Sequence, residues 1–299
     1  MGDAMVVLVT GASTGIGRAA AVELARRGAQ VFGTMRDLAR VGGLSEAAAA
    51  SGVTVEAVEL DVRSAMSVRA CVDHVVAATG RLDVLVNNAA AFVYAPLEFT
   101  TDDELAAVVD TNLVGPLRTI RAVLPVMRRQ GGGRIVNVGS VASEPKFGLP
   151  LSSVYGATKA ALHAISLDLN KELAALGIDV VLCEGGIGGR TAMLGPLHDG
   201  VAAFGHGDGA YAKVEAQARH VAGLLDQFVP EPDRAGEIIA DACLVERPDL
   251  RHPLSEQAEI DRAHTVSDDE YRRACRGEPA PALTSGDAFP AMMWRALAE

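Results

Sequence analysis

Apolar runs alternate with amphipathic stretches along the first two thirds of the chain. The apolar runs are short and nearly continuous, which is typical of parallel strands buried on both faces. The stretches between them place apolar residues three and four apart, as one face of a helix requires. This alternation predicts an α/β fold with a doubly wound parallel sheet and helices on both of its faces. The expected strands are Met5–Val9, Gln30–Met35, Val53–Leu60, Leu82–Asn87, Arg134–Val138 and Ile178–Cys183, and the expected helices are Arg18–Arg27, Leu38–Ser51, Ser64–Thr79, Leu105–Met127 and one that begins at Ser152 or Ser153.

The last third of the chain has a weaker pattern. A segment at about 187–229 is rich in glycine and ends in an amphipathic stretch, Tyr211–Phe228. A helix is expected at Pro232–Val245 and a short final strand region at Arg247–Leu254. From about 268 onward the sequence is polar and then rich in proline and alanine, which indicates a loosely attached tail. No repeat or linker interrupts the chain, so residues 1–299 are predicted to form a single domain.

A glycine-rich turn joins the first strand to the first helix. It is Thr10–Gly17, with the sequence T-G-A-S-T-G-I-G. A strand, a glycine turn and a helix in this order place backbone N–H groups and the start of a helix against a pyrophosphate. Gly11 would permit the tight turn, Gly15 the close approach of backbone to ligand, and Gly17 the packing of helix on strand. Because no lysine follows the turn, it favours a nucleotide site other than that of a phosphate-loop ATPase.

The end of the second strand bears on which nucleotide would bind. An NAD site places a carboxylate about twenty residues beyond the glycines, against the ribose hydroxyls. This chain has Met35 and then Arg36 there, and a guanidinium suits a 2′-phosphate by charge and by geometry. Asp37 follows directly and would suit NAD, and a solvated loop arginine is the other interpretation of Arg36. We therefore expect NADP(H) to be favoured over NAD(H).

A tyrosine and a lysine share one face of the helix that follows Pro150. Tyr155 and Lys159 stand four residues apart, so their side chains can touch. A positive charge beside a phenol favours the phenolate and lowers the tyrosine pKa. Such a pair would exchange a proton with an alcohol or carbonyl oxygen near neutral pH. The same spacing is common on the surface of ordinary helices, so the pair gains meaning only beside other motifs.

Six stretches of the chain carry motifs that occur together in one enzyme family. They lie within about residues 5–191, and in their order and spacing the chain resembles the short-chain dehydrogenase/reductase family. The tail at Arg247–Leu254 weakly resembles the hydroxysteroid-dehydrogenase-like branch of that family. The resemblance implies a Rossmann-type fold and an oxidoreductase that moves hydride between NADP(H) and a carbonyl or secondary alcohol carbon. The six motifs are Thr10–Gly17, Asp61-Val62, Asn87–Ala90, Asn112, Ser140 and Tyr155–Lys159.

The resemblance also implies a role for each residue. Tyr155 would give or take the proton, and Lys159 would hold the nicotinamide ribose and lower the tyrosine pKa. Ser140 would bind the substrate oxygen, and Asn112 would steady a water that relays the proton. Asp61 and Val62 would bracket the adenine. The catalytic residues implied are Asn112, Ser140, Tyr155 and Lys159, and the cofactor contacts implied are Gly11, Ser13, Thr14, Gly15, Ile16, Gly17, Arg36, Asp61, Val62, Asn88, Ala89, Ala90, Tyr155, Lys159, Gly186, Ile187 and Thr191.

Three positions depart from the family pattern. Ala90 stands where the family has glycine. The loop after Ser140 is slightly longer than usual, which leaves Ser143 as a second candidate for the serine role. Gly185-Gly186 stands where the family has Pro-Gly, and a backbone of unusual freedom leads from there to Thr191.

Composition and charge narrow the partners. The net charge is −11, without basic clusters, which argues against nucleic acid or an anionic membrane. No apolar stretch approaches membrane-spanning length, and the chain runs almost directly into its first strand, so no signal peptide is expected. The four cysteines lack metal or redox spacing, which favours a reducing cytoplasm. His206 and Asp208 have no third ligand at a suitable spacing, so no metal site is expected.

These inferences combine into one hypothesis and one rival. The hypothesis is a cytoplasmic, NADP(H)-dependent enzyme that interconverts a carbonyl and a secondary alcohol on an apolar small molecule. By resemblance, the segment at about 187–229 covers the substrate, and the helices around Leu105–Met127 and Tyr155–Leu176 build a homodimer or homotetramer. Core packing alone would also explain the composition of these helices. The rival is a non-catalytic NADP(H)-binding sensor or partner protein on the same fold. A complete set of catalytic residues favours the enzyme.

Overall fold

The computed structural model describes residues 4–143, 150–185, 209–225, 232–249 and 251–254. At its centre lies a seven-stranded sheet with the order β3-β2-β1-β4-β5-β6-β7, in which every neighbouring pair is parallel. The chain winds outward from β1 in one direction and from β4 in the other, so the predicted doubly wound, Rossmann-type α/β fold is confirmed. The elements are β1 (Val6–Val9), α1 (Gly15–Arg26), β2 (Gln30–Met35), η1 (Leu38–Arg40), α2 (Gly42–Ala50), β3 (Glu56–Glu59), α3 (Ala65–Thr79), β4 (Val84–Asn87), η2 (Leu97–Phe99), α4 (Asp102–Val109), η3 (Asp110–Val114), α5 (Gly115–Gln130), β5 (Gly133–Ser140), η4 (Val141–Ser143), α6 (Ser153–Leu173), η6 (Ala174–Leu176), β6 (Ile178–Gly185), α8 (Ala212–Leu225), α9 (Pro232–Leu244) and β7 (Arg251–Pro253).

The helix expected at Leu105–Met127 is observed as α4, η3 and α5, and two further elements also differ from those expected. The third strand pairs with β2 only over Glu56–Glu59, so it is shorter than the apolar pattern of Val53–Leu60 predicts. The helix expected at Leu38–Ser51 is split, because Asp37 caps a single turn, η1, before α2 begins at Gly42. Positions 187–208 and 226–229 of the expected substrate-covering segment and the tail from about 268 lie outside the described residues.

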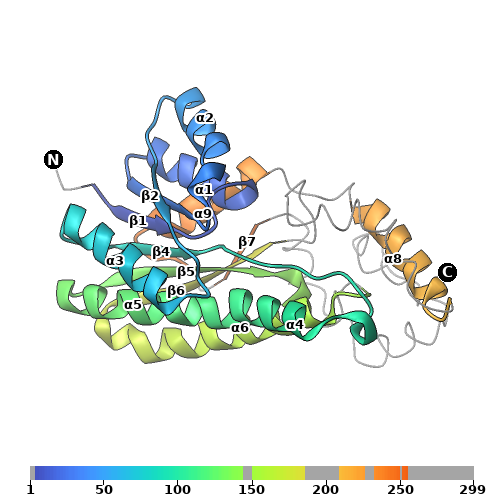
Figure 1. The fold of residues 1–299 in the computed structure, drawn as a ribbon. Helices are drawn as coiled ribbons and strands as arrows, with labels where there is room; N and C mark the ends of the chain where they lie inside the picture. Colours follow the sequence, from blue (N-terminus) through green and yellow to red (C-terminus); the bar gives the residue numbers. More distant parts are fainter. Residues whose placement is uncertain (1–3, 144–149, 186–208, 226–231, 250, 255–299) are drawn as a thin grey trace, which may run out of the picture.

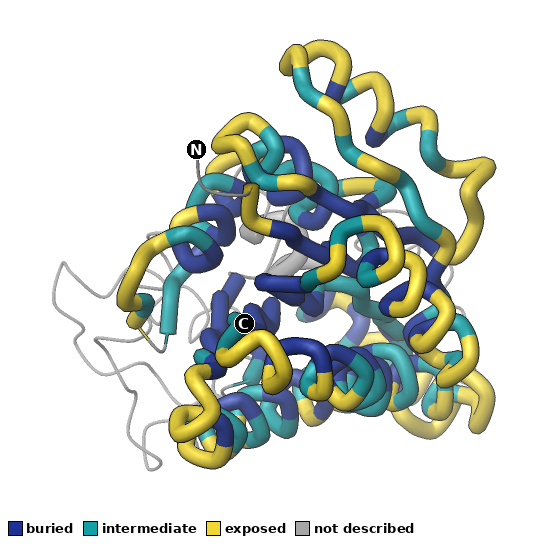
Figure 2. The backbone as a smooth tube through the Cα atoms, turned by 90° about the vertical axis from the view of Figure 1, so that its left-hand side faces the viewer, coloured by how far each residue is buried: buried dark blue, intermediate teal, exposed yellow. Residues whose placement is uncertain are grey.

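The sheet is covered on both faces, and its strands alternate their side chains between two cores. Helices α1, α2 and α9 lie on one face, and α3, α5 and α6 lie on the other (Figure 1). Along β1, Val7 and Val9 enter the first core while Val6 and Leu8 enter the second. Figure 2 shows the strands as buried tube between helices whose outer turns are exposed. Burying each such side chain stabilises the fold by about 1.5–3 kcal/mol.

Helices α4 and α5 are joined by a π-helical turn, η3, rather than by a loop. Helix α4 begins at a capping box. The Thr101 side chain accepts from the N–H of Glu104, and the Glu104 carboxylate accepts from the N–H of Thr101. At Asp110–Val114 the hydrogen bonding widens, and Asn112 lies in this turn with 1% of its surface exposed. A π turn inside a helix is rare and occurs often at functional sites.

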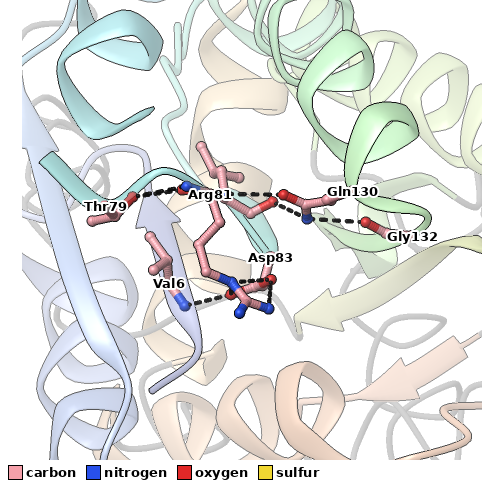
Figure 3. A network of polar contacts seen from close by, with 7 residues as sticks. Val6, Thr79, Arg81, Asp83, Gln130 and Gly132 are labelled. Carbon is pink, nitrogen blue, oxygen red and sulfur yellow. Dashed lines mark hydrogen bonds and ion pairs between the residues drawn. The ribbon is translucent and has the colours of Figure 1, made fainter. Parts of the chain in front are cut away.

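The amino-terminal edge of the sheet is closed by a polar network. Asp83 accepts a hydrogen bond from the N–H of Val6 at 2.8 Å, and the Arg81 guanidinium donates to both Asp83 oxygens at 2.7–3.0 Å. Gln130 donates to the carbonyls of Leu82 and Gly132 at 2.8 and 3.0 Å. Figure 3 shows how these contacts join the start of β1, the start of β4 and the end of α5. Groups that the strands leave unpaired at this edge are thereby satisfied.

Candidate active site

A cavity of about 700 Å³ opens at the carboxyl ends of the strands. Ligands of doubly wound sheets bind at this edge, where the strand order reverses. Of the residues expected at the site, Gly186, Ile187 and Thr191 lie outside the described part of the chain. Asn112 is not among the described residues that line the cavity. The expected residues that do line it are Gly11, Ser13, Thr14, Gly15, Ile16, Gly17, Arg36, Asp61, Val62, Asn88, Ala89, Ala90, Ser140, Tyr155 and Lys159.

The glycine turn follows β1 and forms one wall of the cavity. Gly11 has φ +68°, and a Cβ there would lie 2.8 Å from the Cα of Ala89, so only glycine fits without strain. A Cβ on Gly17 would lie 2.2 Å from Nδ2 of Asn88. Gly17 therefore makes room for an asparagine side chain, as well as for the close packing that the sequence predicts. The start of α1 is left open toward the cavity by this arrangement.

Asn88 ties the glycine turn to the end of β4. Its Nδ2 donates to the carbonyls of Thr10 and Gly11, both at 3.0 Å. The Thr10 hydroxyl in turn accepts from the N–H groups of Asn88 at 2.9 Å and Ala89 at 3.0 Å. The Asn88 side chain thus holds the turn in place besides lining the cavity. Thr10 was quoted in the motif but was not expected as a site residue; only the structure reveals that it links the two strands.

Positive charge gathers where β2 and β3 end. Arg36 is exposed and lines the cavity, and Arg40 and Arg63, which the sequence analysis did not select, line it too. Asp37 lines the cavity too, and its Oδ1 accepts from the N–H of Ala39 at 2.9 Å. Hydrogen bonding from Arg63 holds the pKa of the Asp61 carboxyl below its usual range.

Tyr155, Ser140 and Lys159 meet at the floor of the cavity. Tyr155 and Lys159 come from the first two turns of α6, and Ser140 ends β5. The Tyr155 hydroxyl is hydrogen-bonded to the Ser140 side chain. The Lys159 Nζ donates to the carbonyl of Val138 at 2.8 Å and lies 5.7 Å from the centre of the Tyr155 ring. The structure therefore brings the three side chains together as expected from the sequence.

The protonation of this pair differs from the sequence prediction. Burial raises the pKa of Tyr155 to about 12, although the hydrogen bond from Ser140 acts in the opposite direction. Burial lowers the pKa of Lys159 to about 8. The prediction that Lys159 lowers the tyrosine pKa is wrong for this state of the protein, because loss of solvent around the phenol dominates. Tyr155 is therefore protonated near neutral pH.

Asn112 is a positioning residue in this structure. Its Oδ1 accepts from the N–H of Ala91 at 2.7 Å, and its Nδ2 donates to the carbonyl of Ala91 at 2.8 Å and to the Thr158 hydroxyl at 3.2 Å. The side-chain amide thus pairs with the backbone of Ala91 as a neighbouring strand would. It also fixes α6 one residue before Lys159.

Ser143, the second candidate for the serine role, points to a different group. Its hydroxyl donates to the Glu184 carboxylate at 3.5 Å. Burial would raise the pKa of Glu184, but hydrogen bonds from His163 and Arg251 outweigh it and lower the pKa. No sequence motif indicates this cluster, because its members are far apart in the chain. Ser140 is the serine that faces Tyr155.

Phe92 is a cavity residue that the sequence analysis missed. Its ring packs against Tyr155 in a T-shaped arrangement, with ring centres 4.9 Å apart. The only available signal was its place two residues after Ala90, at the tip of β4. Aromatic residues in that position are more often core residues, so the pattern alone could not select it.

Comparisons with known proteins agree with this geometry. The family model described as short chain dehydrogenase matches residues 5–201. Estradiol 17-beta-dehydrogenase 1 of Rattus norvegicus is 37% identical over 266 residues, which is 84% of this chain and 73% of the rat protein. A short-chain dehydrogenase from Streptomyces avermitilis has a similar structure, with a TM-score of 0.71 and 35% identity over 87% of this chain and 90% of that one. A metagenomic short-chain oxidoreductase in complex with NADP has a TM-score of 0.62 and 25% identity, and the match covers 83% and 95% of the two chains.

Proposed function

This chain belongs to the short-chain dehydrogenase family, in its hydroxysteroid-dehydrogenase-like branch, and from that premise we propose that it reduces an apolar ketone with NADPH or oxidises the corresponding secondary alcohol. The family membership makes it an oxidoreductase that uses a nicotinamide cofactor and interconverts carbonyl and alcohol groups. The proposal adds the preference for NADP(H), the acid/base role of Tyr155 and the apolar nature of the substrate. The hydrogen-bonded Tyr155 and Ser140 hydroxyls at the cavity floor are the observation that carries it.

The residues around the cavity fit a dinucleotide. Gly11 and Gly17 keep side-chain atoms out of the space where backbone approaches a pyrophosphate, and α1 begins there with free N–H groups. Asp61 and Val62 line the part of the cavity beyond β3, where an adenine would lie. Arg36 lines the cavity beyond β2 and would bind a 2′-phosphate, while the neighbouring Asp37 carboxylate, which also lines the cavity, is partly engaged by the backbone N–H of Ala39. The structural neighbour that binds NADP supports the same preference.

The side chains at the floor suit proton transfer in the direction of reduction. A phenol whose pKa is about 12 holds its proton near neutral pH and can donate it to a carbonyl oxygen as that oxygen gains negative charge. Ser140 shares a hydrogen bond with the phenol and would hold the same oxygen. Lys159 presents an ammonium whose pKa is about 8, so it can bind a ribose hydroxyl and stabilise the phenolate left behind. When bound in the cavity, NADPH would supply the hydride.

The apolar character of the substrate is inferred from two observations. Ala90, Ala91 and Phe92 line the cavity beside Tyr155, so the wall near the reacting carbon is apolar. The similar rat protein is named for estradiol, which is a largely apolar molecule. A substrate of this kind would gain free energy from burial of its surface, at about 25 cal/mol per Å².

The test is oxidation of NADPH in the presence of a panel of ketones, followed at the absorbance of the reduced nicotinamide. We expect turnover with apolar ketones and faster turnover with NADPH than with NADH. Binding of NADPH without oxidation of any ketone, and without reduction of NADP⁺ by the matching alcohols, would instead favour the non-catalytic sensor.

A further inference from the structure

Phe92 packs against two other aromatic rings beside the cavity. The Phe92 ring meets the Tyr155 ring with centres 4.9 Å apart and planes at 73°. The Phe92 ring also stacks on Tyr94, with centres 5.9 Å apart and planes at 18°. Phe92 lines the cavity, whereas Tyr94 lies behind it with 7% of its surface exposed. Phe92 is therefore the aromatic residue that a bound molecule would meet next to the Tyr155 hydroxyl.

The backbone that carries Phe92 is fixed at both ends. The Asn112 side chain accepts from the N–H of Ala91 at 2.7 Å and donates to the carbonyl of Ala91 at 2.8 Å. On the far side, the N–H of Ala95 donates to the carbonyl of Leu151 at 3.1 Å. Burial also raises the pKa of Tyr94 far above its usual value, which reflects how closely its ring is enclosed. Phe92 thus has a rigid support, and a rigid wall discriminates between ligands better than a mobile one.

We propose that Phe92 contacts the substrate and selects ketones that carry a flat, unsaturated ring on the carbonyl carbon. This rests on the proposed function. A carbonyl oxygen held by Tyr155 and Ser140 has its carbon beside the Tyr155 ring, so one of the two substituents lies along Phe92. An aromatic face attracts another ring in an offset or T-shaped arrangement beyond the effect of buried area. That attraction corresponds to about a 2- to 10-fold preference over a saturated ring of the same size.

A matched pair of ketones tests this. Acetophenone and cyclohexyl methyl ketone have the same carbon skeleton and differ only in the unsaturation of the ring. We expect Phe92→Leu to reduce the ratio of kcat/KM for acetophenone to kcat/KM for the saturated ketone by about 2- to 10-fold, mainly through KM. Phe92→Tyr keeps a ring and should keep the ratio. Leu97→Ala, at a side chain that is 60% exposed and does not line the cavity, is the control that should change nothing. An unchanged ratio in Phe92→Leu overturns the proposal.

A binding measurement separates this inference from the proposed function. In saturation-transfer NMR with NADP⁺ present, the ring protons of acetophenone should receive magnetisation from the unmodified protein, and much less from Phe92→Leu. If the unmodified protein turns over no ketone, the proposed function fails while this measurement still decides the role of Phe92. If Phe92→Leu does not fold, the two ketones are compared on the unmodified protein. Equal or tighter binding of the saturated ketone then refutes the ring preference.

Discussion

The two edges of the sheet use polar side chains in opposite ways. At the amino-terminal edge, Asp83 accepts from the N–H of Val6 and from the guanidinium of Arg81. At the carboxyl-terminal edge, Tyr155 and Lys159 are buried, their pKa values are displaced, and they border a cavity. Interactions at the first edge serve folding. Groups at the second edge are held in an unfavourable environment, which is the usual arrangement where a protein performs chemistry.

This difference between the edges predicts how substitutions at each should affect stability and turnover. At the amino-terminal edge they should reduce stability and leave turnover by the folded protein intact. At the carboxyl-terminal edge they should reduce turnover or cofactor affinity and leave stability nearly unchanged, or even raise it. Each of the four experiments below can contradict this division.

The largest effect is expected for Tyr155→Phe. The substitution keeps the ring and its packing on Phe92 but removes the proton and the hydrogen bond to Ser140. We expect turnover of a ketone by NADPH to fall by about 10²-fold or more, with NADPH affinity and thermal stability close to those of the unmodified protein. Near-normal turnover would remove Tyr155 from the mechanism, and unfolding would place it among the structural residues.

Arg36→Ala should have the next largest effect. Loss of a charge-assisted hydrogen bond to a 2′-phosphate costs about 1.5–3 kcal/mol, which is a 10- to 150-fold weaker affinity for NADPH. Affinity for NADH should hardly change, because NADH has no phosphate at that position. Fluorescence titration with both cofactors measures this difference. Equal losses of affinity for NADPH and NADH would mean that Arg36 supports the loop. Arg40→Ala is a second test, which shows whether another arginine that lines the cavity gives the same result.

Asp83→Ala tests the other edge. It leaves the N–H of Val6, which is 2% exposed, without its acceptor, and it removes the ion pair of Arg81. We expect a loss of about 1–3 kcal/mol in the free energy of unfolding, measured by urea denaturation. Asp83→Asn keeps an acceptor for Val6 and should lose less. Turnover by the fraction that remains folded should be unchanged, and a clear fall in kcat would contradict the division between the edges.

The smallest effect concerns pH. Burial lowers the pKa of Lys159 from its usual 10.5 to about 8, so above pH 8 the folded protein loses a proton that the unfolded chain retains. Stability therefore rises with pH in this window, by about 1–2 kcal/mol between pH 8 and 9.5, and this lysine contributes no slope well below pH 8. Lys159→Met should abolish that slope. The difference between the two proteins in denaturation at several pH values isolates the lysine, and identical slopes would mean that its pKa is not depressed.

The sequence predicted the parts of both edges that depend on local pattern. The strands, the glycine turn and the spacing of Tyr155 and Lys159 follow from apolar runs and from residues a few positions apart. The Asp83 network could not be predicted, because it joins residues 77 positions apart. The direction of the Tyr155 pKa was predicted wrongly, since it depends on how much protein surrounds the phenol. Phe92 was missed for a similar reason: its meaning comes from the ring it meets across the fold.

The π turn at Asp110–Val114 makes the structure sensitive to the number of residues between α4 and α5. Such a turn holds one residue more than a regular helix would, and removing one of the residues that flank Asn112 in it would let ordinary helical pairing close through it. Each residue of a helix turns the chain by about 100°. A single deletion would therefore rotate α4 against α5 and carry Asn112 away from Ala91. Among related chains, we therefore expect a deletion within the π turn to accompany altered catalysis more often than a substitution at Leu113 does.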